Sequence, residues 1–153
     1  MDDKEYLSPE GLKELQDKLN DLKTKKRLEI AERLEYAKEL GDLSENAEYA
    51  EAKDQQMANE TEIANLEGIL SRAVVIGKTS SNEVRIGSVV ACKKKGNDEQ
   101  TFTIVGREEA DPLKGKISNE SPLGRAFLGR KKNDKILVST PKGDVEYLIT
   151  QIS

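Results

Sequence analysis

Histidine and tryptophan are absent from this sequence, and cysteine occurs once, as Cys92. Zinc sites are built mainly from histidine and cysteine, and a Ser-His-Asp triad needs a histidine, so the composition argues against both. A single cysteine cannot form an internal disulfide, which fits a reducing compartment. Cys92 lies in a strand-like run and is expected to be structural. Any bound metal is expected to be a hard ion held by oxygen, such as Mg²⁺.

Long apolar runs are also missing. No stretch of about 18 apolar residues occurs, so we expect no transmembrane helix and no membrane partner. The N-terminus, MDDKEYLSPEG, lacks the basic and apolar regions of a signal peptide, so a cytoplasmic protein is expected. Hydrophobic and charged residues each make up 35% of the chain, which favours an extended helical element joined to a small globular unit.

The charge is distributed unevenly. Residues 1–72 contain 19 acids and 11 bases, a net charge of −8, whereas residues 73–153 contain 10 acids and 14 bases, a net charge of +4. This asymmetry indicates two units with different surroundings. An acidic N-terminal unit argues against simple coating of nucleic acid, which requires lysine and arginine to neutralise phosphates.

The first unit shows helical periodicity. Ser8 suits an N-cap and Pro9 the first helical position. A heptad seam follows, is interrupted at 24–27, and resumes in a shifted register; its members are Leu12, Leu15, Leu19, Leu22, Ile30, Leu34 and Ala37. Gly41 is a natural helix stop.

A second helical segment follows directly. We predict its seam at positions 47, 50, 54, 57, 61, 64 and 68, with the apolar side thickened near the base by Leu66, Ile69 and Leu70. Two helices of about 30 residues joined by a short loop must run antiparallel, which predicts a long coiled-coil hairpin with residues 41–45 at its far end.

The second unit reads as a small sheet, so the fold class is α+β. Runs rich in β-branched residues occur at 73–78, 87–95, 100–106, 135–140 and 144–152. Pro141-Lys142-Gly143 predicts a tight hairpin, and Ser121 and Pro122 open one short helix that Gly129 stops. We predict domains at 1–75 and 80–153, with 79–86 as a boundary loop.

The sequence GDLSENAEY at 41–49 allows two interpretations. Asp42 and Glu45 match the D-x-x-E form of a capping box, in which both acids serve only the second helix. However, residues 35–54 hold seven acids against Lys38 and Lys53, and concentrated like charge at an exposed end is unfavourable. Two carboxylates are too few for Mg²⁺ alone, but they could help to hold the ion if another macromolecule supplied the remaining ligands.

GDLSENAEY, the following EAKDQQ, and ISNESPLGRAFLGRKKNDKILVSTPKGDVEYLI resemble the bacterial Gre transcript cleavage factor family, in its GreA-type branch. The resemblance covers essentially the whole chain. It implies an antiparallel coiled coil that enters the secondary channel of RNA polymerase. It also implies an FKBP-like antiparallel β-sheet domain that docks on the rim of that channel. The acidic hairpin is similar to the GreA type rather than to GreB, whose hairpin carries a broader basic patch.

By this resemblance, Asp42 and Glu45 are the tip acids that help the polymerase hold its second Mg²⁺ and a water. Backtracked RNA is then cut endonucleolytically by the polymerase, and the new 3′ end restarts elongation. The resemblance therefore implies that the protein stimulates an activity and is no enzyme itself. A monomer that binds no metal tightly in isolation is expected.

Further residues carry weaker expectations. Asn46 and Tyr49 match the motif and either support the tip or simply order the turn. Lys38 and Lys53 either face the displaced RNA or lie on a solvated helix surface, and the basic run at 23–27 leaves the same choice open. The resemblance makes three residues of the short helix candidates for polymerase docking, although they also form its N-terminus: Ser121, Pro122 and Leu123.

Two rival functions stay open at this point. One is an inhibitory paralogue that occupies the channel, although such relatives are expected to depart from the Asp42/Glu45 pattern. The other is a coiled-coil adaptor or prolyl-isomerase-like module without a role in RNA cleavage, because a fold does not by itself confer an activity.

Overall fold

The computed structural model describes residues 3–42 and 45–153. The chain divides into two compact units. One is a helical hairpin of Leu12–Arg72, and the other combines Ala73–Ser153 with the N-terminal residues up to Gly11. The first residues of the chain therefore fold with its C-terminal half, a feature that no local pattern in the sequence reveals.

The first arm of the hairpin is a continuous helix made of α1 (Pro9–Asp21), a π-helical turn η1 (Leu22–Lys26) and α2 (Arg27–Glu39). As predicted, the helix begins at Pro9, and the Ser8 hydroxyl accepts a hydrogen bond from the Gly11 N–H at 3.0 Å. The π-helical turn lies where the leucine spacing predicts a change of register, because an inserted residue rotates the side chains that follow. The expected seam beyond it is confirmed by three buried residues: Ile30, Leu34 and Ala37.

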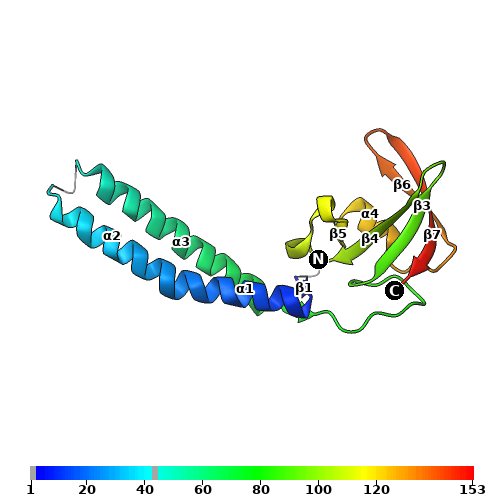
Figure 1. Cartoon of the computed structure of the whole chain (residues 1–153), viewed down its shortest axis with the longest axis horizontal. Coiled ribbons are helices and arrows are strands. Elements are labelled where there is room, and N and C mark those ends of the chain that lie inside the picture. Colours follow the sequence, from blue (N-terminus) through cyan, green and yellow to red (C-terminus); the bar gives the residue numbers. More distant parts are fainter. Residues whose placement is uncertain (1–2, 43–44) are drawn as a thin grey trace. The chain divides into compact units, whose positions relative to one another are not determined.

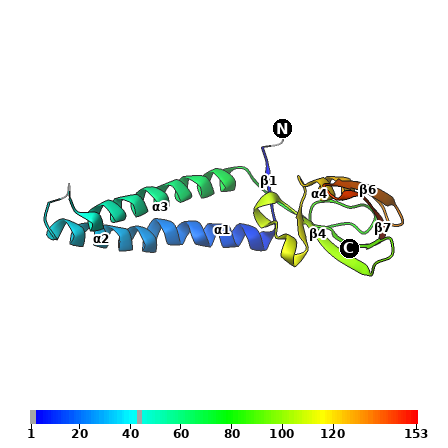
Figure 2. The same ribbon diagram turned by 90° about the horizontal axis from the view of Figure 1, so that it is seen from above.

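The second arm is α3 (Ala47–Ser71), and both views show it running beside the first arm (Figures 1 and 2). The seam predicted for this arm is wrong. Positions 47, 50, 54, 57, 61 and 64 are exposed, and Met57 keeps 70% of its surface in solvent. The residues that face the first arm are instead Ala52, Asn59, Ile63, Leu66 and Ile69.

The physical reason for this difference is the amount of apolar surface. The predicted positions keep the three–four spacing but carry mostly small or polar residues, whereas Ile63 and Leu66 each bury a full aliphatic side chain. Asn59 is tolerated on the buried face because its Nδ2 donates a hydrogen bond to the Leu22 carbonyl oxygen at 3.1 Å.

The other unit contains a five-stranded curled sheet in the order β5-β4-β3-β7-β6. Its strands are β3 (Val89–Lys94), β4 (Glu99–Val105), β5 (Lys116–Ser118), β6 (Lys135–Thr140) and β7 (Gly143–Ile152). Three of the pairings are antiparallel, as expected, but β5 joins β4 in parallel. The predicted tight turn between β6 and β7 is confirmed, with Gly143 at φ 116° and paired with Thr140.

A separate parallel pair joins β1 (Glu5–Leu7) to β2 (Ala73–Val75). The short helix α4 (Pro122–Phe127) packs its Phe127 into the core of the sheet. No regular element covers the expected boundary loop, yet Val84 in that loop is 1% exposed and belongs to the same core. Within the described ranges, no helix combines the length and apolar character that crossing a bilayer requires.

Candidate functional site at the hairpin tip

The acidic motif lies at the end of the hairpin opposite Leu12 and Arg72 (Figure 1). Between the end of α2 at Glu39 and the start of α3 at Ala47, the structure places Asp42 and Glu45 at the surface. Leu43 and Ser44, the middle of the predicted D-x-x-E box, lie outside the described residues. Because the side chains of Asp42 and Glu45 are exposed, both acids are accessible to another macromolecule.

The capping box predicted for Asp42 and Glu45 is wrong. The N-cap of α3 is Asn46, with φ −92° and ψ 100°, and its side-chain oxygen accepts a hydrogen bond from the Tyr49 N–H at 3.1 Å. Asparagine caps helices about as well as aspartate, so the cap needs no contribution from the acids. The N-terminus of α3 is therefore capped by Asn46 and by neither of the two acids.

Asn46 makes a second contact across the tip. Its Nδ2 donates to the Ala37 carbonyl oxygen of α2 at 2.5 Å, and the Leu40 N–H donates to the same oxygen at 3.2 Å. The amide of Asn46 thus satisfies one end of α3 and joins it to the end of α2. Gly41, at φ 129°, lets the chain leave α2 in a conformation that other residues rarely adopt.

Tyr49 and Lys53 come together on one face of α3. The Tyr49 ring packs against the buried residues Ile30, Leu34 and Ala52, and the Lys53 Nζ lies 5.7 Å from the ring centroid. This distance is suitable for a cation–π contact. Tyr49 therefore packs across the hairpin beneath the tip, whereas the charge of Lys53 stays at the surface.

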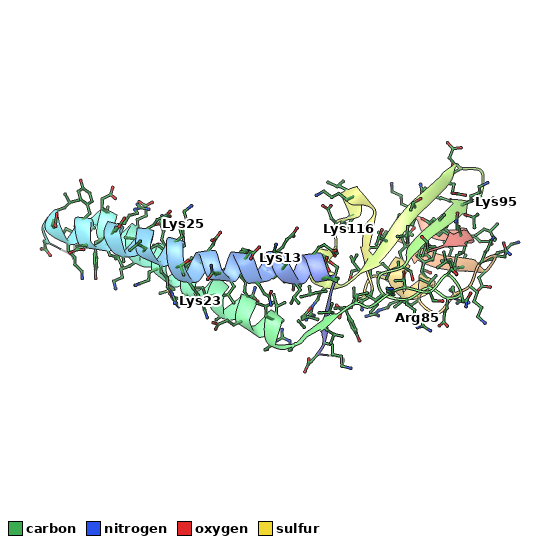
Figure 3. All side chains as sticks on the ribbon, turned by 60° about the horizontal axis from the view of Figure 1, so that its bottom comes forward. Lys13, Lys23, Lys25, Arg85, Lys95 and Lys116 are labelled. Atoms are coloured by element: carbon green, nitrogen blue, oxygen red, sulfur yellow. The ribbon has the colours of Figure 1, made fainter. Side chains whose placement is uncertain are left out.

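Basic residues of the first arm pair with acids of α3. Each of these ion pairs links the two arms across the exposed edge of the seam: Lys18–Glu62, Lys23–Glu67 and Arg27–Glu60. Lys23 and Arg27 of the basic run at 23–27 are therefore paired within the hairpin. Figure 3 labels Lys23 and Lys25 on the first arm. Lys38 lies exposed in the last turn of α2, where a positive charge favours the helix dipole.

Arg33 is a residue near the tip that the sequence reasoning missed. Its Nη1 donates to Gln55 Oε1 at 2.6 Å, and its Nη2 lies 3.8 Å from Glu48 and 3.7 Å from Glu51. The available signal was that Arg33 is a base on the first arm directly before the acid-rich 35–54 segment. Its positive charge offsets part of the acidity of α3 at Glu48 and Glu51.

The side chains of the two acids offer carboxylate oxygens, which are the donors that Mg²⁺ prefers. Among the residues that the structure describes, no three acidic, histidine or cysteine side chains are grouped so that they could hold a metal ion. Mg²⁺ requires six oxygen ligands in a nearly octahedral arrangement. Asp42 and Glu45 carry the donor atoms that this ion prefers, and two carboxylates supply only part of its six ligands.

The second candidate surface surrounds the start of α4. The Ser121 hydroxyl accepts from the Gly124 N–H at 3.0 Å and donates to the Ser118 carbonyl at 2.7 Å, so the predicted N-cap is confirmed. Pro122 is exposed, and Leu123 is half-buried against the sheet core. With Ile117 and Val138 they line an apolar groove of about 330 Å³.

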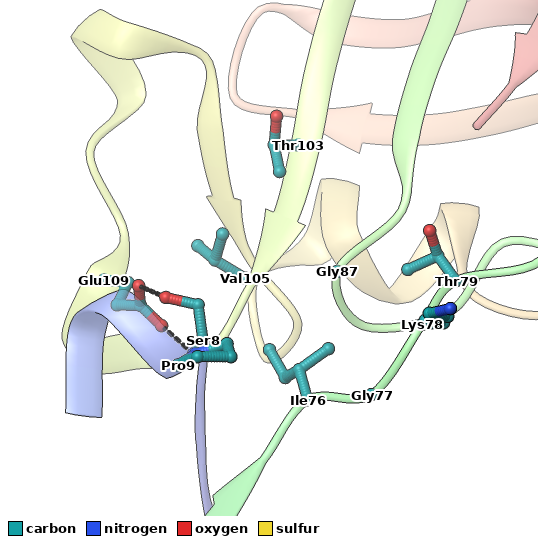
Figure 4. Close-up of a pocket in the computed structure, with 10 residues that line it drawn as sticks. All are labelled: Ser8, Pro9, Ile76, Gly77, Lys78, Thr79, Gly87, Thr103, Val105 and Glu109. Atoms are coloured by element: carbon teal, nitrogen blue, oxygen red, sulfur yellow. Dashed lines mark hydrogen bonds between the residues drawn. The ribbon is translucent and has the colours of Figure 1, made fainter. Parts of the chain in front are cut away.

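Another hollow, of about 470 Å³, lies around Ser8 and Glu109 (Figure 4). Glu109 Oε2 accepts from the Ser8 N–H at 2.7 Å, and Glu109 Oε1 accepts from the Ser8 hydroxyl at 2.6 Å. These bonds join Ser8, the residue before α1, to Glu109 of the same unit. The hollow is therefore explained by the anchoring of the N-terminal segment.

Comparison with known proteins gives matches to both halves of the chain. The family described as "Transcription elongation factor, N-terminal" matches residues 5–75, and the one described as "Transcription elongation factor, GreA/GreB, C-term" matches residues 79–153.

Several relatives are identical to this chain at nearly half of the aligned positions. A transcription elongation factor GreA from Roseiflexus sp. (strain RS-1) is 48% identical over 150 residues, which cover 96% of each chain. The GreA from Clostridioides difficile (strain 630) is 46% identical over 155 residues, covering 99% of this chain and 98% of the relative. The crystal structure of GreA factor homolog 1 of Thermus thermophilus is 29% identical, covers 98% of this chain and 99% of that one, and has a TM-score of 0.44.

Proposed function

Because the chain belongs to the GreA/GreB family of transcription elongation factors, we propose that its hairpin tip enters the secondary channel of RNA polymerase and promotes cleavage of backtracked RNA. The resemblance predicted from the sequence is thereby confirmed at the level of the family. The observation that supports the proposal is that different residues cap the second helix and present the acidic side chains at the tip. Asn46, and neither acid, is the N-cap of α3. Asp42 and Glu45 both lie exposed at the end of the slender hairpin.

In this proposal the two carboxylates act on a metal that the polymerase holds. Asp42 and Glu45 supply two of the oxygen ligands of a second Mg²⁺, and the polymerase supplies the others together with the RNA phosphate. When bound, that Mg²⁺ activates a water for attack on the phosphodiester bond. The factor therefore holds and orients ligands, and the scissile site belongs to the polymerase.

The shape of the hairpin supports a role at a buried active centre. Two helices packed along a single seam form an element only two helix diameters wide, or about 20 Å. The first arm runs for 31 residues from Pro9 to Glu39 without a break in the helix, which corresponds to about 45 Å. Such an element can reach a site that a globular domain cannot enter.

The apolar groove at the start of α4 is the proposed docking surface for the rim of the channel. Ser121, Pro122 and Leu123 lie along this groove, and Leu113, which is 99% exposed, lies in the chain segment that borders it. Apolar surface that is accessible in the free protein is typical of interaction sites. In this proposal the sheet unit binds the rim of the channel, and the hairpin is available to enter the channel.

The decisive experiment measures RNA cleavage in a reconstituted backtracked polymerase complex, with and without this protein, across Mg²⁺ concentrations. We expect the wild type to accelerate cleavage, and Asp42→Asn or Glu45→Gln to lower the rate by about 100-fold, because each removes a charged metal ligand. Neither residue is the N-cap, so the melting temperature and polymerase binding should stay nearly unchanged.

Asp17→Asn, the same chemical change on the exposed face of α1, is the matched control and should cleave like the wild type. If Asp42→Asn and Glu45→Gln both retain full activity, the two acids have no role in cleavage. If the wild type itself blocks elongation without cleaving RNA, the protein is an inhibitor that occupies the channel. If it neither binds the polymerase nor alters elongation, the adaptor alternative holds.

A further inference from the structure

Asn59 of α3 and Asn46, which caps this helix, both bind main-chain carbonyls of the first arm. Asn59 Nδ2 donates to the Leu22 oxygen at 3.1 Å near the π-helical turn, and Asn46 Nδ2 donates to the Ala37 oxygen at 2.5 Å beneath the tip. Both bonds cross from one arm of the hairpin to the other. They differ in position along α3, because 13 residues of helix separate them by about 20 Å.

The bond made by Asn46 closes a loop that contains both acids of the motif. Asp42 and Glu45 lie between Ala37 and Asn46, which are nine residues apart in the chain. The other end of the same side chain, Oδ1, accepts from the Tyr49 N–H at 3.1 Å and so fixes the asparagine to α3. Because both ends of the amide are engaged, one planar group sets the distance between the Ala37 carbonyl and the first turn of α3.

The packing beneath the amide adds to this constraint. Tyr49, whose N–H binds Asn46, packs its ring against Ile30 and Leu34 of the first arm. Asn46 is itself only partly exposed, unlike the two acids. The amide therefore rests on the last packed layer of the seam, and the chain beyond it carries the carboxylates.

We propose that Asn46 is a positioning residue for the reaction: its amide bridge holds Asp42 and Glu45 at the spacing needed to share one Mg²⁺ with the polymerase. This inference rests on the proposed function. It predicts that loss of the bridge impairs cleavage by weakening the shared metal site, although Asn46 touches neither metal nor RNA. Without the bridge, the two carboxylates are expected to point at one ion together less often. More Mg²⁺ is then needed to fill the shared site.

Asn46→Ser tests this inference because serine caps a helix about as well as asparagine but has no amide N–H₂ to reach the Ala37 oxygen. We expect cleavage at saturating factor to fall by about 10-fold at limiting Mg²⁺, and the Mg²⁺ concentration for half-maximal cleavage to rise several-fold. High Mg²⁺ should restore part of the lost rate. The melting temperature should change little, because the cap is retained.

Asn59→Ser is the matched control, since it removes the equivalent bond between the arms far from the tip. It should lower the melting temperature at least as much as Asn46→Ser but leave the Mg²⁺ dependence at the wild-type value. An unchanged Mg²⁺ dependence for Asn46→Ser, or an equal shift for Asn59→Ser, would overturn the inference while leaving the proposed function intact. If the wild type stimulates no cleavage, the proposed function fails and the inference fails with it.

Discussion

The curled-sheet unit and the helical hairpin differ in how they exclude water. In the sheet unit, nine side chains that are at most 5% exposed form one core around Phe127, whose ring centroid lies 6.1 Å from Phe102 and 6.0 Å from Tyr147. Near the tip of the hairpin, the buried cluster consists of Ile30, Leu34 and Ala52, with Tyr49 packed against it. One unit has a core in three dimensions, whereas the other has a single seam.

The hairpin compensates for its thin seam with polar links between its arms. Ion pairs such as Lys18–Glu62 and Arg27–Glu60 are exposed, and exposed pairs each contribute little to stability. The amides of Asn46 and Asn59 instead fix positions, because they bind main-chain oxygens. The sheet unit therefore derives its stability from burial, whereas the hairpin buries less surface along its length and keeps its geometry by specific hydrogen bonds.

The largest effect on stability is expected from Phe127→Ala, which should destabilise the sheet unit by about 3–5 kcal/mol because it empties the centre of the core. The part of the near-ultraviolet circular dichroism that comes from Tyr147, which packs against this core, should be lost at much lower urea concentration, while helicity at 222 nm persists. Leu137→Ala, at a position 63% exposed, is the control and should stay within about 0.5 kcal/mol of the wild type. Loss of helicity together with the sheet would show that the hairpin depends on that core.

A smaller effect is expected in the hairpin and tests which face of α3 is buried. Ile63 is 3% exposed and Met57 is 70% exposed. Ile63→Ala should destabilise the hairpin by about 2 kcal/mol, at the lower end of the usual range because a thin seam can collapse around the missing atoms. Met57→Ala should have almost no effect in the same thermal melt at 222 nm. The reverse order of the two variants would restore the seam predicted from spacing.

The ion pair between Arg27 and Glu60 should have a weaker effect that depends on pH. The hydrogen bond from Arg27 lowers the pKa of Glu60 below its ordinary 4.5, and the same bond raises the pKa of Arg27. For a carboxyl with a lowered folded pKa, the added stability is present above pH 4.5 and is lost as the pH falls through the folded value.

Glu60→Gln should therefore lower the melting temperature slightly at neutral pH and low salt, and should match the wild type in acid or in about 1 M salt, where charges are screened. Glu14→Gln, on the exposed face of α1, serves as the control. A difference between Glu60→Gln and the wild type that persists unchanged in acid would mean that the pair stabilises by packing instead of charge.

The smallest effect concerns Cys92 in the sheet core. Burial, with a contribution from Glu99, raises the pKa of its thiol to about 11. The reactive thiolate is therefore scarce at pH 8, and iodoacetamide should modify the protein rapidly in urea but hardly at all when it is folded. The stability that the neutral thiol contributes is present below pH 9.0 and is lost as the pH rises through about 11. Rapid alkylation of the folded protein would show that this part of the core opens readily.

Part of the fold was predictable because its signals are local. The N-caps Ser8 and Ser121 were correct, since each lies directly before a proline at the first helical position. The change of register near Thr24 was visible in the leucine spacing and corresponds to η1. The parallel strands β1 and β5 were missed, because strands of three residues have little pattern and form only when a distant partner is present.

The candidate site was predictable in composition but not in detail. The acids of GDLSENAEY were recognisable from the sequence, yet their local assignment as a capping box was wrong. Aspartate and asparagine have nearly equal capping preferences, so spacing cannot choose between Asp42 and Asn46. In the folded hairpin, Asn46 caps α3 and also donates to the Ala37 carbonyl oxygen of the first arm, a contact that spacing does not reveal.

Local spacing and motifs in the sequence were enough to predict two helical arms, a tip that carries Asp42 and Glu45, and the family. Only the tertiary structure decided which face of α3 is buried, that the N-terminal segment folds with the C-terminal half, and that Asn46 closes the tip. The first two features depend on groups far apart in the chain, and the third depends on a contact between the ends of the two arms. Their free energy appears only when burial and hydrogen bonding across the fold are both in place.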